Sequence, residues 1–155
     1  MTAEIRAIAK TLYMTDFVSW IEATVQQLRH QEYGQVDWEN LIEEIEDMSR
    51  RERRALESNL IVVMLHLLKW QYQPECRSGS WKASLREHRR RIQKALQDSP
   101  SLMGYVNETF EDCYGEGRMQ ASDETGLALG VFPEHCPYSL DPVLDSSFLP
   151  EMTHS

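Results

Sequence analysis

The sequence predicts an all-α protein, a helical bundle built on a long central helix with an extended C-terminal tail. Two observations lead to this prediction. The segment 37–74 contains no helix breaker before Pro74, and its apolar residues keep helical spacing along its whole length. The second half of this segment becomes apolar on every side, which is typical of a helix surrounded by other helices.

Local signals mark the ends of the first two helices. Thr15 or Asp16 can cap a helix that runs to about His30. Its apolar face consists of Phe17, Ile21, Thr24, Val25 and Leu28. The long helix is expected to begin after Asp37 and to end at Pro74, because proline disfavours helical backbone in the residue before it. One stripe of this helix carries Trp38, Leu41, Ile42, Ile45, Leu56, Leu60, Val63, Leu67 and Trp70.

A charged residue, Glu52, interrupts that apolar stripe. Either the helix bends near Ser49, or a carboxylate is buried in the bundle. Burial of a carboxylate without a partner costs so much free energy that we favour the bend.

Two further helices are expected after a turn at 78–80. In the third helix, Trp81, Leu85, His88, Ile92 and Ala95 share one face, and the arginines occupy the others. A fourth helix should start with Ser99 as its cap and Pro100 at its first position, and should stop at Gly126. Its stripe consists of Met103, Val106, Phe110, Tyr114, Gly117 and Ala121. Glycine weakens a helix interior, so Gly115 and Gly117 indicate close packing or a break.

The chain of 155 residues is expected to form a single helical domain over 1–155. Residues 1–14 are an N-terminal extension, residues 15–126 form the bundle, and residues 127–155 form a docked tail. Prolines recur in the tail, which suits an extended path across the bundle. Its aromatic residues would attach it to the helices, namely Phe132, Tyr138 and Phe148.

Composition excludes several classes of protein. No apolar run approaches the roughly 20 residues that span a bilayer, so we expect no membrane segment. Three cysteines without a CxxC pair fit reduced thiols, and a cytoplasmic location is expected. The net charge of -9 disfavours nucleic acid as a partner, although the third helix is basic.

Several longer strings resemble a known family. They are DWENLIEEIEDM, ERRALES, HLLKWQYQPE and FPEHCPY, together with the pair Ser80-Trp81. These strings resemble the bacterial, chiefly cyanobacterial family known as domain of unknown function 29, over about Tyr13 to Pro150. The resemblance implies a mostly helical single domain. It transfers no catalytic residue, because the family has no established activity.

The histidines are the only candidates for chemistry. If the second and third helices form an antiparallel hairpin, His66 and His88 lie level, because each is eleven residues from Arg77. Two imidazoles could bind a metal ion with a third ligand, but the only nearby candidate is Cys113. We therefore favour core histidines hydrogen-bonded to neighbours, with no metal and no cofactor.

We expect a non-enzymatic protein that acts through protein–protein contacts, because no catalytic template is present. The partner would be an unidentified protein or a second copy of the chain. The expected interaction patch combines aromatic and basic residues, namely Trp70, Tyr72, Trp81, Arg86, Arg89 and Arg90. One alternative is a metal- or small-ligand-dependent enzyme centred on His66 and His88. A second alternative is nucleic-acid binding through the basic third helix.

Overall fold

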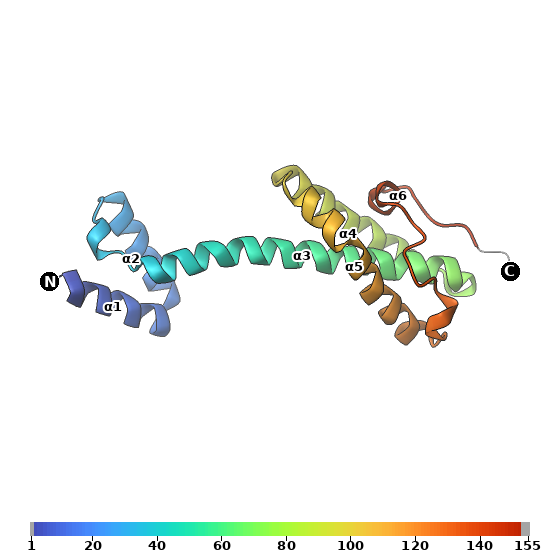
Figure 1. Ribbon diagram of the computed structural model, residues 1–155, viewed down its shortest axis with the longest axis horizontal. Coiled ribbons are helices and arrows are strands. Elements are labelled where there is room, and N and C mark those ends of the chain that lie inside the picture. Colours follow the sequence, from blue (N-terminus) through green and yellow to red (C-terminus); the bar gives the residue numbers. More distant parts are fainter. Residues whose placement is uncertain (1, 153–155) are drawn as a thin grey trace. The chain divides into compact units, whose positions relative to one another are not determined.

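The structure is a computed structural model that describes residues 2–152. It is all-α, with six helices and no strand in the described residues, and the longest helix lies near the middle of the sequence (Figure 1). This confirms the predicted fold class. By its internal packing the chain divides into two compact units, residues 1–50 and 51–155, where the sequence predicts a single domain.

The first unit contains two complete helices and the beginning of a third. Its elements are α1 (Thr2–Thr15), α2 (Phe17–Arg29), a 3-10 turn (Tyr33–Gln35) and the first part of α3 (Trp38–Tyr72). Asp16 caps α2, as predicted, because its carboxylate accepts a hydrogen bond from the Ser19 backbone at 3.0 Å.

Residues 2–14 of the expected extension belong to helix α1, which contacts α2 and the start of α3, and residue 1 lies outside the described residues. The ring of Tyr13 meets Trp20 edge to face at 4.9 Å between centroids, and its hydroxyl donates to Glu44 at 2.7 Å. Lys10 pairs with Glu39 at 3.1 Å. The buried face of α2 is therefore the one that carries Trp20, which the predicted apolar stripe omitted.

The second unit contains the main hydrophobic core. It comprises the rest of α3, α4 (Gly79–Asp98), α5 (Leu102–Thr125) and the short α6 (Leu140–Leu144). The second half of α3 lies in the core, as its all-round apolar pattern predicted. Its fully covered side chains are Leu56, Leu60, Val63, Met64, Leu65, Leu67 and Leu68.

The start of α5 differs from the prediction. The helix begins at Leu102 with Ser101 before it, whereas Ser99 and Pro100 lie in the turn after α4. Met103, placed on the apolar stripe, is exposed, and Leu102 is buried instead. Gly126 ends α5 in the left-handed conformation that glycine adopts without strain, as predicted.

The tail beyond α5 is held by hydrogen bonds to its backbone carbonyls. The Tyr114 hydroxyl donates to the Pro133 carbonyl at 2.6 Å, and Arg118 donates to the Phe132 carbonyl at 3.0 Å. Phe132 and Val143 are buried in the same core cluster as α3, so these tail residues contribute to the core of the second unit.

Helix α3 continues without a break through Ser49, and Glu52 is exposed. The alternative of a buried carboxylate is therefore wrong. The predicted apolar stripe is not fully covered along the first half of α3. Trp38, Ile42 and Ile45 are all exposed, because an amphipathic pattern shows where an apolar face lies and not what covers it.

None of the described helices combines the length and the apolar character that a membrane span requires.

Candidate functional site

His66 of α3 and His88 of α4 both lie partly buried in the second unit, and each ring is hydrogen-bonded. The Nδ1 atom of His66 lies 2.9 Å from the carbonyl oxygen of Val62, one helical turn earlier. The Nδ1 atom of His88 lies 2.7 Å from Oδ1 of Asn59, whose amide nitrogen donates to the Ala55 carbonyl. Both partners are acceptors, so both rings carry their proton on Nδ1.

This arrangement leaves the Nε2 lone pair of each histidine free to accept. Burial disfavours the charged imidazolium and lowers the pKa of both His66 and His88, so the rings are neutral at neutral pH. Neutral rings with free Nε2 atoms could accept a proton or bind a ligand. However, residues 2–152 include no group of three or more His, Cys, Asp or Glu side chains placed to hold a metal ion.

Cys113 of α5, the candidate weighed as a third metal ligand and disfavoured, is buried. Its thiol lies 4.0 Å from the carbonyl oxygen of Glu57, and burial raises its pKa to about 11. A thiol that keeps its proton is a weak ligand and a weak nucleophile. The described residues therefore support hydrogen-bonded core histidines better than a metal centre.

The aromatic residues at the turn between α3 and α4 hold cationic side chains. The Trp70 ring lies under Arg77, whose Cζ is 4.8 Å from the ring centroid, and under Lys82, whose Nζ is 5.5 Å away. The Trp81 ring makes the same kind of contact with Lys69, whose Nζ lies 4.6 Å from the ring centroid. Such contacts between cations and aromatic rings each stabilise a structure by about 0.5–2 kcal/mol.

The six residues of the predicted interaction patch do not form one exposed surface, because their burial differs. Tyr72 packs edge to face on Phe132 at 5.3 Å between centroids, inside the tail contact. Arg90 pairs with Glu87 at 2.8 Å, whereas Arg86 is exposed.

Arg89, in contrast, is only 1% exposed and lies inside the fold. Its guanidinium donates to the carbonyl oxygens of Val143 at 2.8 Å and Phe148 at 2.9 Å. The prediction placed the basic residues of α4 mainly on a solvated face. Arg89, however, lies four residues after Leu85 and three before Ile92, and this spacing on the apolar face was the signal that could have identified it as buried.

Exposed apolar side chains concentrate in the first unit, and the sequence analysis did not single them out. On α3 they follow helical spacing: Ile42 is 53%, Ile45 57% and Met48 61% exposed. On α2, Val18, Ile21 and Val25 are exposed as well. Most of the large apolar side chains exposed in the described part of the chain belong to these first 50 residues. The first unit therefore presents more exposed apolar surface for a protein interface than the second unit does.

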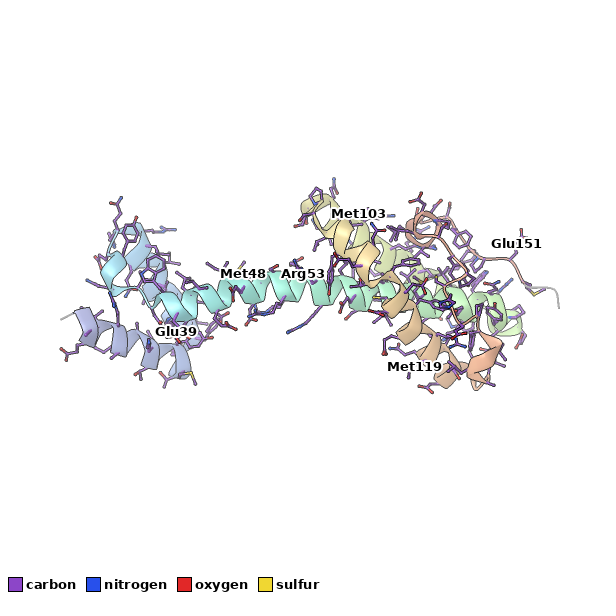
Figure 2. All side chains as sticks on the ribbon, viewed as in Figure 1. Glu39, Met48, Arg53, Met103, Met119 and Glu151 are labelled. Atoms are coloured by element: carbon purple, nitrogen blue, oxygen red, sulfur yellow. The ribbon has the colours of Figure 1, made fainter. Side chains whose placement is uncertain are left out.

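Carboxylates surround the α3 stripe. Three of them share one arginine: Arg50 lies 2.8 Å from Glu43, 3.8 Å from Glu46 and 2.7 Å from Asp47. Residues 37–54 hold seven acidic and four basic residues, so the segment that carries the stripe has a net negative charge. Figure 2 shows Glu39 and Met48 along this part of α3, with Met119 on α5 in the second unit.

Comparison with known proteins yields one match. A family model described as "Domain of unknown function DUF29" matches residues 12–149. No curated protein and no solved structure matches the chain.

Proposed function

The chain belongs to this family of unknown function, and from the surface of its first unit we propose that it is a non-enzymatic domain that binds a partner protein. The observation that carries this proposal is the exposed apolar stripe of Ile42, Ile45 and Met48 on α3. An amphipathic helix of another protein can pack on such an exposed apolar face. The anchoring side chains of the partner helix would then recur at i, i+3 and i+4 intervals.

The charge around the stripe indicates the chemistry of the partner. The segment 37–54 around the stripe holds seven acidic and four basic residues, so it carries a net negative charge. A partner helix with an apolar face flanked by lysines or arginines would complement this surface, and the opposite charges would speed association. Two copies of the same acidic surface would repel each other, so we propose a different protein as the occupant.

A cytoplasmic location fits this proposal. All three cysteines are free thiols. Burial raises the thiol pKa of Cys113 and of Cys136. Reduced thiols are typical of proteins in the cytosol.

A photo-crosslinking amino acid at position 45 tests the proposal in the native host. Crosslinking at position 119 is the matched control, because Ile45 is 57% and Met119 55% exposed. We expect a defined adduct from position 45 that is absent from position 119. The adduct should weaken when Glu43 and Glu46 are changed to glutamine, because the charge complementarity is lost.

Two results would contradict the proposal. An adduct of twice the mass of the chain would identify a second copy as the occupant. The same products from positions 45 and 119 would show that the stripe has no specific partner, and the alternative functions would then take precedence.

A further inference from the structure

A small pocket lies between α4 and the tail of the second unit, with a volume of about 140 Å³. Its wall on α4 contains three cationic residues, Lys82, Arg86 and Arg89, at helical spacing on one face. Its opposite wall contains Ser146 and Ser147 of the tail. Leu85 and Leu149 complete the lining, which contains no carboxylate.

Two of the three cations lack an acidic partner. Lys82 and Arg86 form no ion pair in the described residues, although most of their basic neighbours on α4 do. Arg90 and Arg91 both pair with Glu87, and Lys94 pairs with Asp98 at 3.1 Å. The uncompensated positive charge of α4 is therefore focused at this pocket, and the overall negative charge of the chain does not cancel it locally.

The third cation, Arg89, is buried at the pocket. Its guanidinium is held by carbonyl oxygens of the tail, including the one of Pro142 at 3.3 Å, and by no carboxylate at hydrogen-bonding distance. Burial lowers the pKa of Arg89, and the nearest opposing influence comes from Asp145. An anion in the pocket would relieve this cost, because it would supply the charge that the surroundings lack.

The remaining groups suit an oxyanion. Lys82 is positioned by the Trp70 ring, 5.5 Å from its centroid, and that contact leaves its N–H groups free to donate. The guanidinium fork of Arg86 matches the geometry of phosphate oxygens. Asp145 does not line the pocket, and its carboxylate accepts from the Ser147 backbone and hydroxyl, each at 2.8 Å.

We propose that this pocket binds a phosphate group, either as the free anion or as the terminal group of a phosphomonoester. At about 30 Å³ for each water molecule, a pocket of this volume holds four or five waters, which the oxygens of one phosphate would replace. Lys82 and Arg86 bind the anion, Ser146 donates its hydroxyl, and Arg89 supplies positive charge from the buried wall.

Calorimetric titration of the full chain with inorganic phosphate and with O-phosphoserine tests the proposal. We expect saturable binding, weakened about tenfold or more by Lys82→Gln and by Arg86→Gln, since each removes a charged contact. Arg86 is exposed, so Arg86→Gln should leave the melting temperature unchanged, whereas Lys82→Gln also removes the contact with Trp70 and should lower it slightly. The matched control is Arg91→Gln, which removes a charge from α4 outside the pocket and should change affinity less than twofold.

The two ligands distinguish the two sources of the phosphate group. Tighter binding of O-phosphoserine than of inorganic phosphate would identify a phosphomonoester, and equal or weaker binding would identify the free anion. The proposal is overturned if neither ligand binds at about 20 mM, a concentration that saturates a millimolar site. It is also overturned if Arg91→Gln weakens binding as much as Arg86→Gln, because attraction would then be to the general charge of α4.

Discussion

Gly117 of α5 and Met64 of α3 are packed so closely that a β-carbon added to Gly117 would lie 2.8 Å from the β-carbon of Met64. The same added atom would lie 3.2 Å from the backbone carbonyl oxygen of Ile61. Neither neighbour is the free end of a flexible side chain. The contact therefore fixes how near α5 approaches the core half of α3.

Gly117→Ala is expected to lower the free energy of unfolding by about 1–3 kcal/mol, because the overpacking exceeds the gain in helix propensity. Gly115→Ala is the matched control, since a β-carbon at Gly115 meets no atom within 4 Å. It should stabilise the protein by up to about 1 kcal/mol. Chemical denaturation measures both changes. Equal effects of the two substitutions would show that the helix contact is looser than described.

Arg89→Ala is expected to release the tail. It removes a buried donor from the carbonyl oxygens of Val143 and Phe148 and leaves them unpaired, at a cost of about 3 kcal/mol or more. Limited proteolysis should then cut between Leu127 and Phe148, where we expect the native protein to resist. Arg90→Ala, an exposed control, should change stability by less than about 0.5 kcal/mol. A tail that stays resistant in Arg89→Ala would show that its aromatic contacts suffice.

Local signals in the sequence correctly predicted the start of α2 and the end of α5. Asp16 and Gly126 act within one turn of themselves, so their effects do not depend on the rest of the fold. The cover of each apolar face depends on distant segments and could not be predicted in the same way. Ile42 and Ile45 belong to the same predicted helical stripe as the buried Leu56 and Leu60, yet only the latter pair is covered.

Prediction of the candidate sites failed for a related reason. Arginine is normally solvated, so its residue type outweighed the position of Arg89 on the apolar face, and its acceptors lie in the tail more than 50 residues away. The pocket beside it exists only because α4 and the tail meet. For the histidines the sequence predicted hydrogen bonds to neighbouring groups, and His66 and His88 lie within hydrogen-bonding distance of Val62 and Asn59.

Glu52→Gln is expected to change the free energy of unfolding by less than about 0.5 kcal/mol. The Glu52 side chain is exposed, and exposed substitutions away from caps and ion pairs have effects of this size. Urea denaturation of the two proteins provides the measurement. A loss of about 3 kcal/mol would instead indicate a carboxylate paired in a buried site.

Protein purified without added metal is expected to contain no stoichiometric transition metal, and a chelator should leave its melting temperature unchanged. Zinc sites normally use at least three protein ligands, whereas His66 and His88 supply two and the Cys113 thiol keeps its proton. Elemental analysis and thermal melting measure these properties. Near one equivalent of zinc, iron or manganese that is lost in His66→Ala would favour the alternative enzyme function.

Stability is expected to decline as the pH falls below about 6.5, because of His66 and His88. Burial lowers the pKa of both rings in the folded protein from the ordinary value of 6.5. As the pH falls through 6.5, the unfolded chain binds protons that the folded chain does not, so the free energy of unfolding decreases. The contribution is fully present above that pH and is lost as the pH approaches the lower folded values.

The double variant His66→Gln/His88→Gln should flatten this decline between pH 6.5 and 5.5, as measured by urea denaturation at several pH values. The difference in slope should stay below about 1 kcal/mol per pH unit, because both rings are only partly buried. Carboxylates with lowered pKa values, such as Glu87 at about 2, lose their contribution only at lower pH and do not interfere. His30→Gln is the control, since that histidine is exposed. An unchanged slope in the double variant would show that the two rings are more accessible to protons than their hydrogen bonds to Val62 and Asn59 indicate.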